Sequence, residues 1–147
     1  MAQTNPNTIV LKTSDQHRTL ERVAGGAISP GHLLQLNSSN QLVKQSTSAG
    51  PVLKLFALEK EYDGKGITGA YASGDTVIAG DFQSGDEVYA RLAAGATAIV
   101  IGDKLIAHTD GTLKKTGATT DFFVAVALEA VDNSGGGAEA MIKVKLI

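Results

Sequence analysis

A short turn-and-strand unit that occurs four times limits what this chain can fold into. Each copy begins with glycine, continues with aspartate or histidine and one variable residue, and ends in an apolar pair or near-pair. Glycine adopts positive φ without a Cβ clash, and an aspartate side chain can bond its own backbone two residues on, so each copy predicts a tight turn that leads into a strand. The four copies begin at Gly31, Gly74, Gly85 and Gly102.

The remaining apolar residues also follow strand patterns. Few segments carry apolar residues at the spacing of a helix face, whereas Ile142, Val144 and Leu146 alternate with lysines, as in a strand with one buried face. The segments 53–58 and 122–128 are almost continuously apolar, which predicts strands covered on both faces. We therefore predict a mainly β fold, either a small β-barrel or a β-sandwich built from hairpins.

An internal similarity supports the hairpins. The segment GHLLQLNSSNQLVKQ (31–45) aligns without gaps on GDKLIAHTDGTLKKT (102–116), and both continue into an Ala-Leu-Glu triplet, at 57–59 and 127–129. Each copy predicts a strand, a polar turn and a returning strand. The turns would span residues 37–40 and 108–111. Two copies about 70 residues apart indicate a weak internal duplication rather than a solenoid, which needs at least three repeats.

The domain organisation follows from length and local composition. A chain of 147 residues fits one compact domain. Residues 1–24 are polar and charged apart from the β-prone island 8–12, so we predict an N-terminal arm that is ordered against a partner or attached as an edge strand. Residues 25–147 form the predicted β-rich domain, in which the glycine-rich segments 63–74 and 132–137 are expected as exposed loops.

The composition argues against several function classes. Thirteen basic and 15 acidic residues leave a net charge of -2, without the basic excess of a nucleic-acid binder. The chain has no cysteine for a thiolate site, and three Tyr, four Phe and no Trp offer few stacking platforms. The longest apolar run, 122–128, is too short to cross a bilayer, and no secretory signal is recognised at the N-terminus. We expect neither nucleic acid nor a membrane as a partner.

The candidate catalytic and metal-binding residues form no recognised motif. His17, His32 and His108 lie in different regions without metal-ligand spacing, and His108 is predicted as a polar turn residue. The sequence has neither a nucleophile elbow nor a phosphate-binding loop. Carboxylates are frequent between residues 75 and 103, but solvated turns explain most of them. We expect no catalytic residue, no cofactor and no metal, and hence not an enzyme.

One short segment supports an alternative function. Ala140-Met141-Ile142-Lys143 is similar to the Ala-Met-Lys-Met tip of biotin-carrier domains, which are also small β-barrels. Here the lysine comes one residue late and lies inside an alternating strand rather than at a turn. A carrier domain of the biotinyl or lipoyl type, or another β-barrel binding module, remains the alternative.

Four segments together carry a family resemblance that covers most of the chain from Ala24 onward. They are AGGAISPGHLLQL (24–36), SGDEVYARLAAG (84–95), GDKLIAHTDGTLKKT (102–116) and FVAVALEAV (123–131). In these segments the chain resembles the capsid decoration proteins of tailed bacteriophages, also termed cement or auxiliary head proteins.

The resemblance implies a structural virion protein. Such a protein would bind the outer surface of the head, with the major capsid protein as partner, and would bridge capsomers as a homo-oligomer, with a trimer favoured over a dimer. It would be made in the host cytoplasm and reside on the exterior of the virion. Binding only to the mature shell would stabilise that state by mass action, and several arms on one oligomer would raise the effective concentration of weak contacts.

The N-terminal arm supplies the predicted capsid contacts. The segment 8–12 is expected to add a strand to an exposed sheet edge of the capsid protein, and the basic side chains of the arm suit an acidic surface. A solvated arm without a partner fits the charge equally well. The predicted capsid-binding residues are Thr8, Ile9, Val10, Leu11, Lys12, Arg18 and Arg22.

Overall fold

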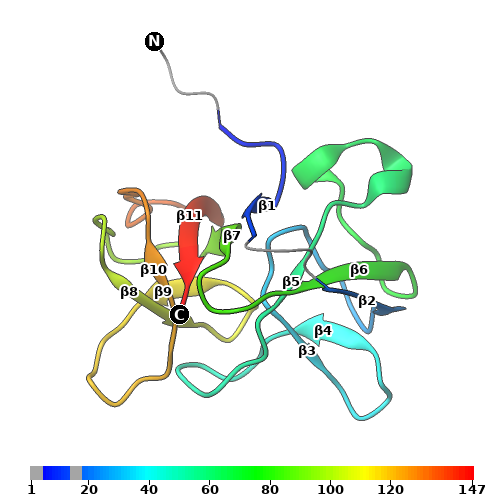
Figure 1. The fold of residues 1–147 in the computed structure, drawn as a ribbon, viewed down its shortest axis with the longest axis horizontal. Helices are drawn as coiled ribbons and strands as arrows, with labels where there is room; N and C mark the ends of the chain where they lie inside the picture. The colour runs from blue at the N-terminus through cyan, green and yellow to red at the C-terminus, as the bar shows by residue number, and fades with distance from the viewer. Residues whose placement is uncertain (1–4, 14–17) are drawn as a thin grey trace.

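A computed structural model describes residues 5–13 and 18–147, which form a mainly β fold with two short 3-10 turns (Figure 1). The strands are β1 (Val10–Lys12), β2 (Arg18–Val23), β3 (Leu34–Leu36), β4 (Leu42–Lys44), β5 (Leu55–Ala57), β6 (Thr76–Asp81), β7 (Glu87–Leu92), β8 (Lys104–Ala107), β9 (Leu113–Lys115), β10 (Phe123–Ala127) and β11 (Ala140–Leu146). The 3-10 turns are η1 (Glu61–Asp63) and η2 (Gly66–Thr68). Within these described ranges, no helix has the length and apolar character needed to cross a membrane.

Five strands of the C-terminal half close into a small β-barrel, termed here the second barrel. Their order is β7-β11-β10-β8-β9, and β9 returns to β7 through the parallel pair Leu92 and Leu113. All other pairings in this sheet are antiparallel, and β1 pairs with the outer edge of β7. The prediction of a small β-barrel is confirmed, which decides between the barrel and the sandwich.

The N-terminal half repeats this strand plan in a more open form, termed the first ring. β2, β6 and β5 form an antiparallel sheet, and β3 and β4 form the predicted hairpin. A single bridge between Leu33 and Phe56 joins the hairpin to β5, and a parallel bridge between Ala24 and Leu42 joins it back to β2. In Figure 1 the first ring lies on the right and the second barrel on the left.

Matching hydrogen bonds relate the two halves. The Gly31 N–H donates to the Ala57 carbonyl at 2.8 Å, and the Gly102 N–H donates to the Ala127 carbonyl at 2.9 Å. Both alanines belong to the Ala-Leu-Glu triplets of the sequence. By these bonds and the strand order, β2, β6, β5, β3 and β4 correspond to β7, β11, β10, β8 and β9.

The four glycine turns have one common geometry. Their glycines have φ between 91° and 100°, in the region that favours glycine. In each turn the side chain of the residue after the glycine, Asp in three turns and His in one, accepts a hydrogen bond of 2.9 Å from a backbone N–H three residues earlier, whereas the sequence predicted an Asp bond to the backbone two residues on. The donor–acceptor pairs are Ser29–His32, Ala72–Asp75, Gln83–Asp86 and Val100–Asp103.

Two hydrophobic clusters fill the two halves. The smaller one lies in the first ring and consists of Ala24, Ile28, Leu34, Leu42, Leu55, Ala57, Tyr71, Val77 and Ala79. The larger one fills the second barrel and includes Leu33, Phe56, Leu58 and Phe82 of the N-terminal half. Because side chains alternate along an extended chain, the start of β3 with the residue before it, and β5, serve both clusters, with Leu34 and Leu55 in one and Leu33 and Phe56 in the other. The two halves therefore share a core.

The glycine-rich segment 63–74 differs from the exposed loop expected of it. It contains η2 and carries Tyr71, whose side chain is fully buried in the first ring. The Tyr71 hydroxyl donates to the Leu58 carbonyl at 3.0 Å, and burial raises the pKa of Tyr71 to about 12. This segment therefore supplies a core residue, whereas 132–137 forms no helix or strand, as predicted.

Candidate interaction surfaces

The predicted strand segment 8–12 pairs with the protein's own second barrel. The Ile9 side chain is fully buried in the larger core, and its N–H donates to Glu59 Oε1 at 2.6 Å. The Ile9 carbonyl accepts from the Tyr89 N–H at 2.8 Å. Thr8 and Lys12 are exposed, while Val10 and Leu11 are half-buried. His17 of the predicted arm lies outside the described residues.

The two predicted arginines lie on β2, in a different sheet from β1. Arg18 is exposed and lies opposite Asp81. Arg22 is half-buried, and its Nη1 donates to the Glu21 carbonyl at 2.8 Å while its Nε lies 3.4 Å from Asn40 Oδ1. The structure therefore brings the two arginines to one strand and places Lys12 on another sheet. Capsid contact by the seven residues stays a prediction.

A shallow groove of about 510 Å³ lies between β2 and the turn of the β3–β4 hairpin. The residues that line it are mostly of polar types, apart from Val23, whose surface is 45% exposed. Asn37 holds the turn in shape, because its Oδ1 accepts from the N–H groups of Ser39 and Gln41 at 3.0 and 2.9 Å. The lining residues are Glu21, Arg22, Val23, Ser39, Asn40, Gln41 and Thr76. Sequence patterns missed this groove because polar turn residues and an edge strand give no distinctive motif.

A buried polar cluster joins the first ring to the second barrel. His32 is 3% exposed, and its Nε2 lies 3.0 Å from both carboxylate oxygens of Glu139. Arg91 of β7 places Nη1 3.3 Å from Glu139 Oε2, and its Nε donates to the Pro30 carbonyl at 2.7 Å. The sequence did not reveal this cluster because Glu139 lies 107 residues from His32.

The bonds of His32 define its protonation state. Its Nδ1 accepts from the Ser29 N–H, so the neutral ring carries its proton on Nε2 and donates it to Glu139. Burial lowers the pKa of His32, although the hydrogen bond and charge of Glu139 act in the opposite direction. Both ring nitrogens are thus engaged in bonds that hold the chain together. Among residues 5–13 and 18–147, no group of three or more His, Asp or Glu is arranged to hold a metal ion.

Lys143 is not placed as a carrier lysine would be. It lies within β11, opposite Tyr89, and its N–H donates to Glu129 Oε1 at 2.9 Å. Its Nζ lies 3.8 Å from Glu129 Oε2. A carrier lysine stands at a hairpin tip, so this position argues against the carrier alternative.

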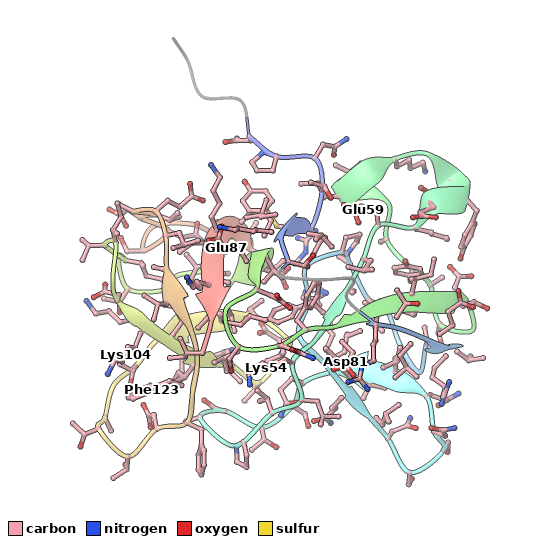
Figure 2. All side chains as sticks on the ribbon, viewed as in Figure 1. Lys54, Glu59, Asp81, Glu87, Lys104 and Phe123 are labelled. Atoms are coloured by element: carbon pink, nitrogen blue, oxygen red, sulfur yellow. The ribbon has the colours of Figure 1, made fainter. Side chains whose placement is uncertain are left out.

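On the second barrel, the lysine side chain of β8 packs over an aromatic ring of β10. Lys104 Nζ lies 4.7 Å from the centre of the Phe123 ring, on the neighbouring strand (Figure 2). Such a contact is worth about 0.5–1 kcal/mol at an exposed site. It stabilises the barrel locally and indicates no ligand.

Comparison with known proteins gives a fold likeness alone. No protein-family model matches the chain. No curated protein sequence matches it. The fold is similar to that in the crystal structure of the head fiber gp8.5 N base of bacteriophage phi29, with a TM-score of 0.58 and 13% sequence identity. The match covers 90% of this chain and 95% of the phage phi29 chain, so both halves of the present chain take part in it.

Proposed function

We propose that this chain is a structural protein of a bacteriophage virion that binds the outer surface of the capsid and stabilises the mature head by bridging capsomers. The observation that carries the proposal is the likeness to the N base of a phage head fiber, which extends over almost the whole of both chains. The sequence resemblance to capsid decoration proteins points to the same class of protein. The two comparisons start from different properties, one from sequence segments and the other from the fold.

The described surfaces suit a binding protein better than an enzyme. Both ring nitrogens of His32, which is buried, form hydrogen bonds within the protein and are not free to react. The groove beside β2 is shallow and open to solvent, unlike the enclosed apolar pockets that bind small molecules. We therefore propose that the protein acts through its surface and does not catalyse a reaction.

The proposal includes the assembly implied by the resemblance. The partner is the major capsid protein, and the protein acts as a homo-oligomer on the virion exterior, as a trimer or a dimer, after synthesis in the host cytoplasm. Thr8, Lys12 and Arg18 are exposed and thus available for capsid contact. Several weak contacts on one oligomer would raise the retention on the head without a large interface per chain.

Cosedimentation tests this function. Purified protein is mixed with mature heads that lack it, and bound protein and the heat resistance of the heads are measured. We expect saturable binding and a higher temperature of DNA release. Replacing both Lys12 and Arg18 by Glu should weaken retention at least tenfold, whereas the matched control Lys65→Glu, at an exposed site near η2, should not.

Two outcomes of that experiment contradict the proposal. Heads that neither retain the protein nor gain heat resistance would exclude capsid stabilisation. Equal losses with the double variant and with Lys65→Glu would exclude the predicted contact residues. Light scattering of the free protein then determines whether it is a trimer, a dimer or a monomer.

A further inference from the structure

The two halves differ at one strand edge. Ala79 of β6 corresponds to Val144 of β11, because each lies opposite the alanine of an Ala-Leu-Glu triplet. Leu20 of β2 lies opposite Ala79, and Val88 of β7 lies opposite Val144. β2 therefore corresponds to β7, and Leu20 corresponds to Val88.

The outer edge of β7 is covered. The Tyr89 N–H donates to the Ile9 carbonyl at 2.8 Å, and the Arg91 N–H donates to the Gly31 carbonyl at 3.2 Å. Val88 lies opposite Val10 in an antiparallel pair with β1. The second barrel therefore shows what an occupied edge of this strand looks like, with β1 as an antiparallel segment along residues 87–89 and Gly31 bonded beyond it.

The corresponding edge of β2 is open. The Ala24 N–H donates to the Asp75 carbonyl at 2.8 Å, toward β6. Because hydrogen-bonding direction alternates along an antiparallel strand, the backbone groups of Thr19, Glu21 and Val23 point away from β6. In the part of the chain that the structure describes, the pairing on that side is limited to the bridge between Ala24, just beyond the end of β2, and Leu42 of β4, and no strand pairs with Thr19 or Glu21 there. The groove described above runs beside this edge.

The open edge carries charged side chains. The guanidinium of Arg22 folds back onto the Glu21 carbonyl, and it forms no ion pair with a carboxylate of the described residues. Charged side chains on an edge strand are a common protection against unwanted strand pairing. They also restrict which segments can pair there, because an incoming strand must place opposite charges beside them.

We propose that the edge of β2 accepts an extended segment of a partner protein as an additional antiparallel strand, in the position that β1 occupies on β7. Backbone hydrogen bonds to Thr19, Glu21 and Val23 would hold it, as in β-strand addition. Arg18, Leu20 and Arg22 share one face of β2. The fitting segment has an apolar residue opposite Leu20 and carboxylates two positions away on either side.

A second copy of β1 fits this edge less well than an acidic segment. On β7, Lys12 of β1 lies opposite Glu87. The residue of β2 that corresponds to Glu87 is Thr19, which has no charge, and the carboxylate of Glu21 lies two positions further along the same face. A second copy would therefore place Lys12 where no carboxylate lies opposite it, which favours a partner with acidic residues.

The first experiment uses a capped peptide, Thr-Asp-Thr-Val-Thr-Asp-Thr, titrated into the ¹⁵N-labelled full chain and followed by NMR. We expect saturable shifts at the amides of Thr19, Glu21 and Val23, and none at Tyr89 and Arg91, whose edge is already occupied. A control peptide with lysine in place of both aspartates should bind at least tenfold more weakly. No saturable shift with the aspartate peptide, equal binding of both peptides, or shifts confined to β7 would overturn the proposal.

Two variants separate backbone pairing from charge. Val23→Pro removes an N–H that faces the open edge and leaves the bonds to β6, so it should abolish binding, whereas Val23→Thr should retain it. Arg22→Glu should remove the preference between the aspartate and lysine peptides, because Arg18 still favours aspartate while the new carboxylate favours lysine. Thermal unfolding of each variant establishes that it is folded; a folded Val23→Pro chain that binds normally, or an Arg22→Glu chain with unchanged preference, contradicts the assignment.

A third peptide tests the competing occupant. A peptide of residues 7–13, Asn-Thr-Ile-Val-Leu-Lys-Thr, should bind more weakly than the aspartate peptide. Tighter binding would assign the edge to a second copy of the chain and overturn the acidic partner. No capsid is needed in these titrations, so their failure is distinguishable from a failure of capsid cosedimentation.

Discussion

The first ring and the second barrel share a strand plan but close it to different degrees. In the second barrel β8 pairs with β10 over three residue pairs, whereas in the first ring the Leu33–Phe56 bridge alone joins the hairpin to β5. Among the described residues the larger core has 20 buried members and the smaller has nine. The larger core includes residues of both halves, so the first ring completes the interior of its neighbour while filling its own.

This division of the core accounts for the difference in closure. β5 is buried on both faces, since Leu55 faces the first ring and Phe56 packs edge-on against Phe82 with 6.1 Å between ring centres. A strand that serves two cores is positioned by both and is less free to pair continuously within one ring. The second barrel makes no such compromise at the corresponding strand β10, whose residues Val124, Ala125 and Ala127 all belong to one core.

The largest loss of stability is expected when either of the two leucines that close the strand rings is truncated. Leu42 and Leu113 correspond to each other and are fully buried, so Leu→Ala should cost about 2–5 kcal/mol at either site. We expect the larger loss at Leu113, because the closed barrel collapses less readily around a cavity. Urea unfolding of both variants measures the difference. A greater loss at Leu42 would contradict the inference that the first ring is the more adaptable half.

The same unfolding curves test whether the halves are independent. Because the larger core contains Leu33 and Phe56 of the first ring, we expect one cooperative transition in the wild type and in both variants. Fluorescence of the tyrosines and far-UV circular dichroism should report the same midpoint. Two separate transitions would show that the halves fold as separate units.

A smaller effect concerns the turns of the two hairpins. Gly111 and Asn40 occupy corresponding positions with φ of 77° and 58°. A Cβ at Gly111 would lie 2.9 Å from the Leu33 carbonyl oxygen, so Gly111→Ala combines backbone strain with a steric clash and should cost about 1–3 kcal/mol. At the exposed Asn40, replacement by Ala should cost about 1 kcal/mol and replacement by Gly almost nothing. Chemical denaturation measures all three; equal costs of the two alanines would contradict the proposed role of the close approach.

The elements that the sequence predicted well are those determined by neighbouring residues. The four glycine turns, both hairpins and the alternation of β11 depend on local backbone preference or on period-2 burial, and each is present. β2 was not singled out as a strand, although an edge strand within residues 1–24 was one of the two alternatives, because Arg-Thr-Leu-Glu-Arg-Val carries charges on an edge and buries little beyond Leu20. Tyr71 was missed because glycine-rich composition predicts exposure, whereas its burial depends on the ring around it.

The candidate surfaces were less predictable than the fold. The cluster of His32, Arg91 and Glu139 requires three distant segments to meet, and periodicity contains no information on which segments do so. The open edge of β2 emerges only when β2 is matched to β7, which requires the strand pairings. Thr8–Lys12 was correctly identified as β-prone, but its partner β7 within the chain could not be read from that island.

The smallest expected effect is a difference in the pH dependence of stability between two corresponding turn residues, His32 and Asp103. His32 occupies the turn position that Asp103 holds in the second barrel, and each accepts a backbone N–H through its side chain. Burial lowers the pKa of His32, and the charged groups that act on it are Glu139, Arg91 and Lys44. Hydrogen bonds from the Val100 N–H and from Lys115 lower the pKa of Asp103.

The sign of the pH dependence follows from these directions. Below the unfolded-state pKa of about 6.5 the unfolded chain takes up a proton at His32 more readily than the folded one, so the free energy of unfolding should fall as the pH drops from 7 to 5. Asp103 contributes stability that is lost only below about pH 4, where its unfolded-state carboxylate is protonated. Urea unfolding at pH 7 and pH 5 should therefore show a loss in the wild type and a smaller one in His32→Asn, which keeps an acceptor for the Ser29 N–H without titrating. An equal loss in the two proteins would show that the histidine turn of the first ring tolerates protonation and that the two halves respond to acid alike.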